Sequence, residues 1–512
     1  MKRVIPFHPL LLPIFPILNF WLINRDFIAF HSTLPWILTG ILTALLLFAI
    51  LSALLKCIEK GAALASLVLI FFLFFGQVRV SLQILFPGVL STPVFCYAWG
   101  CLFLLAAWLI IRVRDIHPVL TDSLNLAASL LLIPLAFGAV QAIREYHTLQ
   151  HPSADDLWGE TAMRPAKEPL PDIYYIILDS YGRGDILSDL YGWDNSDFLD
   201  ALRQRGFFVA EQSQANYMQT PLALAAALNG HYLNPQQFEA DWTNRVMFRP
   251  YLDSTPNLKR LKEWGYEIIS TRDAVEYLEL GTSDRFLASH RGFDEFGLSF
   301  NRVTFNSIWT SDLYEHMLWE ITRDQLDSLE DPSLVSGPPH FVFAHILSPH
   351  PPFNFDARGN YSTTHPAPSM GDRPTAAERE QYIAGYRSQF QFLNSRLTRI
   401  IDRIQSNPQR TAIIILQGDH GPAAFLDNES ADRSCLRERL SILNAYYFPD
   451  PEARARLYPS ITPVNSFRIL LGDLAGRPIP LLPDRSYFST RNRPYDFVDV
   501  TNSVGTCTPL DE

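Results

Sequence analysis

The chain has 512 residues, 48% of them hydrophobic, and a formal net charge of −11. Its first 150 residues hold nine Lys and Arg against five Asp and Glu, which is +4, so the rest of the chain carries −15. A domain this acidic lacks the cationic surface that binding to a phosphate backbone needs. The composition therefore excludes a general nucleic-acid binder, and it is compatible with the binding of metal cations.

Five apolar segments dominate the first 150 residues, and most approach the ~20 apolar residues that cross the hydrocarbon core of a bilayer. The first is interrupted by Pro13 and Pro16. A cleaved signal peptide is the alternative for this segment alone, although no small-residue cleavage site follows it. The predicted spans are residues 10–23, 34–55, 62–85, 94–113 and 124–143.

The basic residues of the loops predict the orientation. With five crossings, one side carries six of them, and the other side has only Arg25, Arg79 and Arg144. The positive-inside rule then puts the N-terminus in the cytoplasm and residues after about 145 outside. We expect a membrane domain at 1–145, a polar, proline-rich linker at 146–171 and an extracytoplasmic domain at 172–512. The six cytoplasmic residues are Lys2, Arg3, Lys56, Lys60, Arg112 and Arg114.

Two of the five cysteines, Cys435 and Cys507, lie in the predicted external domain, where conditions are oxidising. The sequence leaves open whether they form a disulfide, because it does not show whether their Cα atoms are close enough.

Beyond the linker, short apolar runs alternate with helical patterns. Runs that are apolar throughout are typical of strands buried on both faces, so we predict an α/β domain with a mostly parallel central sheet flanked by helices. Ligands of such folds bind at the carboxyl ends of the strands. Strands are expected at 172–178, 207–209, 266–270, 340–347, 411–416 and 440–448, and helices at 195–205, from Thr220, at 257–264 and at 376–405.

Thr220 precedes Pro221 and an Ala/Leu run, a pattern that predicts the start of a helix with Thr220 as its N-cap. A hydroxyl there lies beside free backbone N–H groups, which favour anions such as phosphate. Taken alone, Thr220 is explained as a helix cap.

Two predicted strands end in possible metal ligands. Asp179 follows the strand at 172–178, and Asp419 and His420 follow the strand at 411–416. Two carboxylates, an imidazole and the Thr220 hydroxyl suit one divalent cation, with Mn²⁺ and Zn²⁺ both open and Mg²⁺ possible. Such a cation would make Thr220 a nucleophile and stabilise charge on a phosphoryl group. The alternatives are a turn-forming aspartate and a loop with an incidental ion pair.

The segments Leu-Asp179-Ser, Gln-Thr220, Ser-Pro-His350-Pro-Pro-Phe and Gly-Asp419-His420-Gly together resemble the sulfatase-like branch of the alkaline phosphatase superfamily. Five spans before an external domain are similar to the lipoteichoic acid synthases and the lipid A phosphoethanolamine transferases. The resemblance implies a multi-pass protein of the bacterial inner membrane. It also implies that Asp179, Thr220, Asp419 and His420 hold a catalytic metal.

The same resemblance implies a ping-pong reaction. Thr220 attacks a phospholipid donor, diacylglycerol leaves, and a cell-envelope glycan or lipid acceptor takes the phospho-substituent, such as phosphoglycerol or phosphoethanolamine. His350 then contacts the phosphate or protonates a leaving group. His345 is a second candidate for that role, with a buried structural histidine as its alternative.

Three arginines are further candidates for pairing with phosphate, namely Arg183, Arg437 and Arg439, although ordinary surface or structural roles are the alternative. His231, just after Asn229-Gly230, is ambiguous.

Two departures from the family pattern narrow the prediction. The sulfatase nucleophile lies in Cys/Ser-x-Pro-x-Arg, whereas this chain has Thr220-Pro-Leu-Ala-Leu, which argues against a true sulfatase. No His follows His420, so one metal is favoured over two. Two rival functions stay open: a phosphodiesterase, phosphatase or sulfatase-like hydrolase with the same site, and a non-catalytic membrane sensor with a degenerate one.

Overall fold

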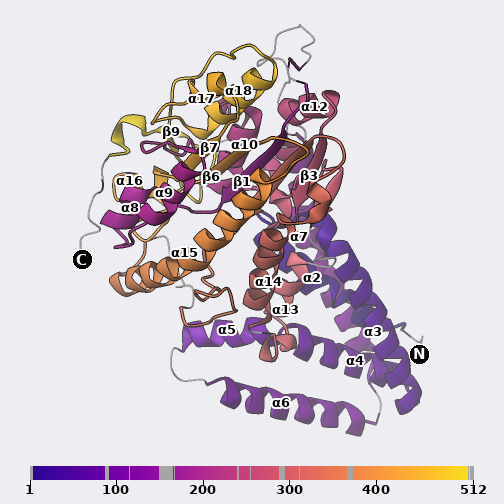
Figure 1. Cartoon of the computed structure of the whole chain (residues 1–512). Coiled ribbons are helices and arrows are strands. Elements are labelled where there is room, and N and C mark those ends of the chain that lie inside the picture. Colours follow the sequence, from indigo (N-terminus) through magenta and orange to yellow (C-terminus); the bar gives the residue numbers. More distant parts are fainter. Residues whose placement is uncertain are drawn as a thin grey trace. The chain divides into compact units, whose positions relative to one another are not determined.

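The structure is a computed structural model of the chain, and it describes residues 4–86, 91–114, 116–148, 165–166, 168–238, 242–253, 255–287, 294–310, 312–365, 373–505 and 507. The chain forms two compact units (Figure 1). The first unit comprises Met1–Leu149 and Asp294–Tyr314, and the second comprises Gln150–Phe293 and Glu315–Glu512. Most of the predicted linker lies outside the described residues.

The first unit consists of apolar helices. Three segments, 30–55, 92–112 and 118–144, are long and apolar enough to cross a membrane, and α4 with α5 makes a fourth if this pair, bent by 48°, is one span. Its helices are α1 (His8–Leu11), α2 (Ile14–Asn24), η1 (Phe30–Thr33), α3 (Leu34–Leu55), α4 (Ile58–Leu73), α5 (Phe75–Leu85), α6 (Thr92–Arg112), α7 (Pro118–Thr148), α13 (Glu295–Asn301) and η5 (Phe305–Ile308).

The first predicted span is shorter than the others. Residues 8–24 form α1 and α2, and together they make a short apolar helix. Pro13 is the N-cap of α2 and Pro16 lies in its first turn, where a proline is tolerated because its missing N–H would have no partner within the helix. Five crossings require this short helix and the bent pair each to cross, so the count stays a prediction.

A seven-stranded sheet forms the centre of the second unit. Its order is β2-β7-β6-β1-β5-β3-β4, and the five strands from β6 to β4 are parallel, while β7 runs antiparallel to both of its neighbours, β6 and β2. The prediction of a mostly parallel sheet is therefore confirmed. The strands are β1 (Asp172–Leu178), β2 (Phe208–Val209), β3 (Glu267–Thr271), β4 (Arg285–Leu287), β5 (His340–Ile346), β6 (Ala412–Gly418) and β7 (Asn444–Tyr447), with β8 (Tyr487–Phe488) and β9 (Val498–Asp499) in a small second sheet.

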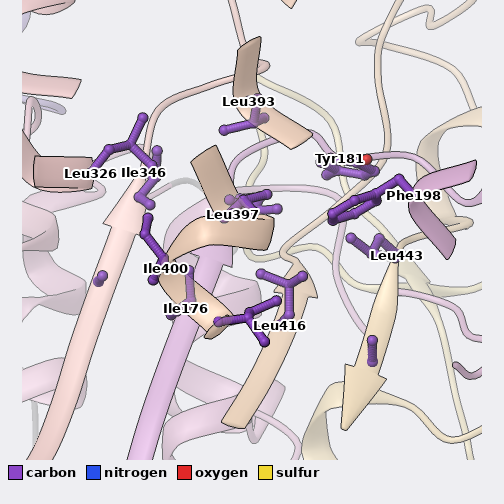
Figure 2. Close-up of a cluster of buried hydrophobic side chains, with 14 of the residues drawn as sticks. Ile176, Tyr181, Phe198, Leu326, Ile346, Leu393, Leu397, Ile400, Leu416 and Leu443 are labelled. Atoms are coloured by element: carbon purple, nitrogen blue, oxygen red, sulfur yellow. The ribbon is translucent and has the colours of Figure 1, made fainter. Parts of the chain in front are cut away.

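Helices cover the sheet on both faces. On one face, Leu393, Leu397 and Ile400 of α15 (Ala376–Gln405) pack in one cluster with Ile176 of β1 and Leu416 of β6 (Figure 2). A full capping box at Thr375 starts α15 at the predicted residue.

The opposite face carries α18 (Pro463–Leu474). The ring of Tyr175 in β1 meets Phe467 of α18 edge to face at 5.2 Å between ring centroids. Strands buried on both faces in this way explain why their sequences do not alternate. The other helices in the C-terminal part of the chain are α8 (Gly184–Asp189), α9 (Ser196–Gln204), α10 (Thr220–Asn229), α11 (Arg249–Asp253), α12 (Pro256–Glu263), α14 (Leu313–Ser328), α16 (Leu436–Leu440) and α17 (Pro451–Arg454).

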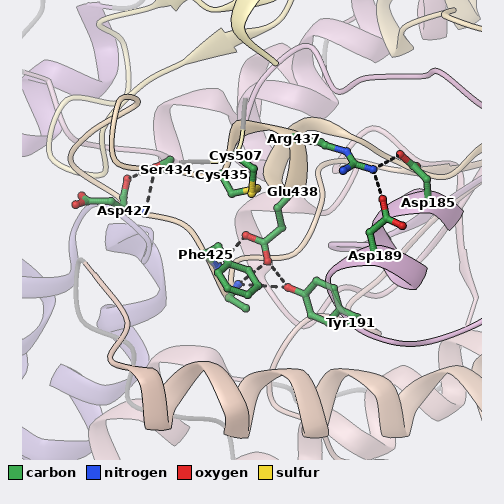
Figure 3. Close-up of a disulfide and its surroundings, with 11 residues drawn as sticks. Asp185, Asp189, Tyr191, Phe425, Asp427, Ser434, Cys435, Arg437, Glu438 and Cys507 are labelled. Atoms are coloured by element: carbon green, nitrogen blue, oxygen red, sulfur yellow. Dashed lines mark hydrogen bonds and ion pairs between the residues drawn. A yellow bond between two sulfur atoms is a disulfide. The ribbon is translucent and has the colours of Figure 1, made fainter. Parts of the chain in front are cut away.

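Cys435 and Cys507 form a disulfide, with their Cα atoms 3.9 Å apart (Figure 3). It ties residue 507 to the start of α16. Glu438 of the same helix accepts hydrogen bonds from the amides of Ala424 and Phe425, both at 2.9 Å, and from the hydroxyl of Tyr191. The loop after β6 is therefore held from its C-terminal side.

Candidate active site

The two aspartates lie side by side because of the strand register. β1 and β6 are parallel neighbours with Leu178 opposite Gly418, so the next residues along each strand, Asp179 and Asp419, emerge together from the sheet. Their carboxylates form a group with His420 in which one ligand atom per residue lies within 4.8 Å of the others. Among the described residues this is the one such group of His, Cys, Asp and Glu.

Thr220 reaches this group from the start of α10. Its Oγ1 lies 3.1 Å from Nε2 of His420. The predicted N-cap is wrong by one residue, because Gln219 is the extended capping residue and Thr220 is the first helical one. The Gln219 side chain makes no capping bond, since it accepts from Nε of Arg245 at 3.0 Å and donates to Oγ of Ser489 at 3.1 Å. The Thr220 hydroxyl is thus turned to His420 and not to the helix.

The hydrogen bonds fix which ligand atoms are available. Nδ1 of His420 lies 3.0 Å from the carbonyl oxygen of Gly421, which can only accept, so Nδ1 carries the proton and Nε2 has the lone pair. Asp419 Oδ1 accepts from the amides of Ser180 at 3.0 Å and of His420 at 2.8 Å. Asp419 Oδ2 is buried and has no hydrogen-bond partner. A buried carboxylate oxygen without a partner is costly, and a bound cation would satisfy it.

The electrostatics of Asp179, Asp419 and His420 favour the binding of a positive charge. Burial, followed by repulsion from Asp419, raises the pKa of Asp179 to about 6. Burial, followed by the nearby charge of Arg439, lowers the pKa of His420 to about 3, so its imidazole is neutral. Two close carboxylates and a neutral imidazole fit a divalent metal, because ligands must be deprotonated to bind one. A single divalent metal therefore fits the side chains of Asp179, Asp419, His420 and Thr220.

His350 lies in the loop after β5. Its amide donates to the carbonyl of Asp179 at 3.1 Å, which fixes the loop to the end of β1. Its Nδ1 lies 2.6 Å from the carbonyl oxygen of Pro351 and therefore carries a proton, which leaves Nε2 to exchange one with a substrate. The charge of His350 also affects the pKa values of Asp179 and His420, so the ring is within electrostatic reach of the group.

His345 is buried, with 1% of its surface exposed, and both ring nitrogens face carboxylates. Nδ1 is 2.7 Å from Oδ2 of Asp273, and Nε2 is 3.6 Å from Oδ2 of Asp179. Burial opposes protonation, but the carboxylate of Asp273 dominates with Asp179 and raises the pKa of His345 to about 9. Two carboxylates thus hold the ring of His345, and its role with substrate stays a prediction.

Arg439 joins the two loops that carry the site. Its guanidinium donates to the carbonyl of Met218 at 2.6 and 3.0 Å and to that of Gly421 at 2.8 Å. The first loop leads to Thr220 and the second follows His420. Arg439 is nine-tenths buried, and this burial lowers its pKa. These contacts support a structural role for Arg439, which was the alternative to pairing with phosphate.

Ser180 and Gly421 adopt backbone positions that the site requires. Ser180 has φ of 66°, a left-handed conformation that is rare for a residue with a side chain. The hydroxyl of Tyr386 holds it there by donating to the Ser180 carbonyl at 2.7 Å and accepting from the amide of Gly182 at 3.0 Å. A Cβ at position 421 would lie 2.0 Å from the carbonyl oxygen of Glu438, so this position must be glycine.

The remaining candidates lie outside this group. Arg183 donates to both carboxylate oxygens of Asp185 at 2.6 and 2.9 Å, and Arg437 pairs with Asp185 at 3.1 Å and with Asp189 (Figure 3). Carboxylates therefore hold both guanidinium groups, and their roles with substrate stay predictions. His231 follows the opposite end of α10 from Thr220, where its Nε2 lies 3.1 Å from Arg468.

The sequence reasoning missed Asp273 and Ser180. Asp273 follows the end of β3, so the rule that drew attention to Asp179 and Asp419 applies to it equally. Ser180 gives no such signal, because its positive φ is visible only in the backbone.

One known protein family matches the middle part of the chain. Residues 171–434 match the family model described as Sulfatase. No match was found among curated proteins. Among solved structures, the C-terminal periplasmic domain of EptC from Escherichia coli in complex with Zn is 14% identical with a TM-score of 0.41, over 69% of this chain and 97% of that one.

Two further solved structures are similar at the same level. The integral membrane protein lipooligosaccharide phosphoethanolamine transferase A from Neisseria meningitidis is 12% identical with a TM-score of 0.41, over 91% of this chain and 95% of that one. The phosphonate monoester hydrolase of Agrobacterium radiobacter is 14% identical with a TM-score of 0.40, over 62% and 80%.

Proposed function

The chain belongs to the sulfatase family, and from that premise we propose that it is a membrane-bound, metal-dependent transferase of phospho-substituents. Its donor is a phospholipid, its acceptor is a cell-envelope glycan or lipid, and Thr220 carries the group between them. The observation that supports this most is the contact of 3.1 Å between Thr220 Oγ1 and His420 Nε2, beside two buried carboxylates.

A divalent metal held by Asp179, Thr220, Asp419 and His420 would favour the alkoxide form of Thr220 and offset charge on the phosphoryl oxygens. Thr220 Oγ1 attacks the phosphorus of the donor, a new P–O bond forms, and the P–O bond to the lipid alcohol breaks. His350 Nε2 gives a proton to the leaving oxygen. An acceptor hydroxyl then attacks the Thr220-bound phosphorus, His350 takes the proton back, and Thr220 is released.

The nucleophile separates this proposal from sulfate-ester hydrolysis. Thr220 replaces the Cys or Ser from which sulfatases make formylglycine, and Leu224 stands where their motif has Arg. A threonine can form a phosphate ester but cannot become that aldehyde. The apolar helices of the first unit support a donor drawn from the bilayer, and the Cys435–Cys507 disulfide supports an oxidising, extracytoplasmic location for the second.

Mass spectrometry of the intact protein after incubation with phospholipid vesicles tests the intermediate. We expect an added mass equal to the transferred group, mapped to Thr220 and missing in Thr220→Val. Thr220→Ser keeps the hydroxyl and should retain the adduct. Head-group release without any adduct in the wild-type protein would exclude the covalent route.

Acceptor dependence separates transfer from hydrolysis. We expect head-group release to accelerate when glycan or lipid acceptors are added, and the acceptor to gain the group. Equal release with and without acceptors would instead identify a hydrolase. If release is undetectable and Thr220→Val still supports the cellular role of the protein, a non-catalytic sensor is the correct description.

A further inference from the structure

Residues Asp294–Tyr314 belong to the first unit although the chain on both sides of them belongs to the second. The chain passes from one unit to the other three times: at 149–150, at 293–294 and at 314–315. Only the first passage lies in the linker that the sequence predicts. The other two deliver a 21-residue segment, which contains α13 and η5, from the α/β unit to the apolar helices.

Helix α13 presents two buried phenylalanines to α2 and α3. Phe296 and Phe300 are 0% and 3% exposed. Their rings lie 5.6 and 5.5 Å from that of Phe20, in edge-to-face geometry. The ring of Trp36 lies 6.1 Å from Phe300. Aromatic pairs of this kind are stabilising beyond the area that they bury.

A polar contact sets the start of α13. Asp294 caps the helix by accepting from the amide of Gly297 at 2.9 Å, and its other carboxylate oxygen accepts from the indole N–H of Trp36. Trp36 is the third residue of α3. One aspartate therefore caps α13 and binds the first turn of a predicted membrane span.

The segment and the helices approach each other so closely that each side carries a glycine at the contact. A Cβ on Gly297 would lie 2.2 Å from the ring of Trp36, and a Cβ on Gly76 would lie 2.7 Å from the backbone of Val303. The amide of Gln77 donates to the carbonyl of Val303 at 3.2 Å. Such fitted approach distinguishes a built contact from apolar surfaces that merely touch.

The turn η5 adds a second patch at the break between α4 and α5. The ring of Phe305 lies 4.9 Å from that of Phe75, edge to face, and 6.3 Å from that of Phe72. The carbonyl of Val303 and the ring of Phe305 both meet residues 72–77, where the bent helix pair turns.

We propose that Asp294–Tyr314 is a second, non-covalent anchor that fastens the α/β unit to its own membrane helices independently of the linker. Phe296 and Phe300 would be exposed to water if the segment left these helices, and the carboxylate of Asp294 would lose its tryptophan. While the linker is intact, the anchor contact is intramolecular and forms at high effective concentration. Once the linker is cut, the two fragments stay together only if the buried contacts of the segment hold them. The anchor does not depend on what the site transfers.

Cleavage at the linker tests the anchor in the full chain. A specific protease site is inserted at residues 155–158, a tag is placed at the N-terminus, and the detergent-solubilised protein is cut and passed over the tag resin. We expect the fragment with the α/β unit to remain bound to the tagged helices. It should be lost to the flow-through in Phe296→Asp/Phe300→Asp.

A glycine pair supplies the matched control from the other fragment. Gly76→Val drives a side chain into the backbone of Val303, whereas a Cβ on Gly100, in α6, meets nothing within 4 Å. We expect Gly76→Val to release the α/β fragment and Gly100→Val to retain it. Trp309→Asp, at a side chain that is 71% exposed in the same segment, should also retain it. Because Gly76 and Phe296 lie on different fragments, misfolding of one fragment does not explain release by both variants.

Three results would overturn the anchor. The wild-type fragments would separate on cleavage, or both anchor variants would stay bound as the wild type does, or Gly100→Val would release the fragment as readily as Gly76→Val. Each is read from the position of a fragment on a gel, so none depends on transferase activity.

Discussion

Nδ1 of His345 lies 2.7 Å from Oδ2 of Asp273, and the opposite ring nitrogen of His345 faces the carboxylate of Asp179 at 3.6 Å. The three residues come from the ends of β3, β5 and β1, three strands that follow one another in the sheet. Because Asp273 holds the buried imidazole of His345, that imidazole fixes the orientation of the Asp179 carboxylate. His345 and Asp273 are thus positioning residues for a proposed metal ligand.

Asp273→Asn should weaken metal binding by about 10- to 100-fold, the usual effect of losing a partner behind a metal ligand. The measurement is titration of the metal-free protein by calorimetry, and higher metal concentration should restore its transferase activity. If Asp273→Asn lost thermal stability and activity together while its metal affinity stayed unchanged, Asp273 would have only a packing role. His316→Gln, at a half-exposed histidine, serves as the control.

Arg439→Gln should lower the free energy of unfolding by about 2–4 kcal/mol, because the carbonyl of Met218 loses the two bonds of the guanidinium and that of Gly421 keeps only the bond from His420. Activity should fall with it, since the loops before Thr220 and after His420 are no longer joined. Thermal unfolding in detergent gives the first quantity. Arg437→Gln removes a partly exposed ion pair and should cost under ~1 kcal/mol. Equal losses in the two variants would contradict the role given to Arg439.

Stability should fall as pH rises from about 4.5 to 7, and Glu438 is the expected cause. Burial raises its pKa from the usual value of 4.5 to about 7 in the folded chain. Below pH 4.5 both states hold the proton. Between the two values the unfolded chain loses it first, so the free energy of unfolding decreases, by on the order of 3 kcal/mol in all.

Thermal unfolding of Glu438→Gln as a function of pH checks this. The variant is neutral throughout, so the slope between pH 4.5 and 7 should become smaller. Glu452→Gln, at an exposed carboxylate, should keep the wild-type slope. An unchanged slope in Glu438→Gln would rule out this carboxyl as the source.

Removal of the disulfide by Cys435→Ser/Cys507→Ser should destabilise the α/β unit by about 2–4 kcal/mol, since the bond closes a loop with a sequence separation of 72 residues. Treatment of the wild type with a thiol reductant should lower its stability by the same amount, and the double variant should not respond to that reductant. A wild-type protein whose unfolding is insensitive to the reductant would contradict the prediction.

The sequence predicted the elements that carry the site because their patterns are local. Residues 172–178 and 411–416 are apolar throughout, which identifies strands buried on both faces, and a polar residue directly after such a strand marks the ligand edge. The start of α10 was off by one residue: Gln219 has the extended backbone of the capping residue, and Thr220 is already helical.

Other features depend on contacts between distant residues. Nothing near Arg183 or Arg437 in the sequence shows that Asp185 and Asp189 take both guanidinium groups. The segment Asp294–Tyr314 has no continuous apolar run, because only one side of α13 is buried, so its membership of the helical unit could not be predicted. The bond between Cys435 and Cys507 was open for the same reason.

The pairing of Leu178 with Gly418 makes the spacing of Asp179 and Asp419 a property of the backbone ladder and not of the loops that follow. Lengthening either loop beyond the turn would leave the two carboxylates where they are. Inserting a single residue inside β1 would instead reverse which side chains point to α15 and which to α18. The spacing of the acidic pair is thus as durable as the sheet itself, whereas the positions of Thr220 and His350 depend on the loops that carry them.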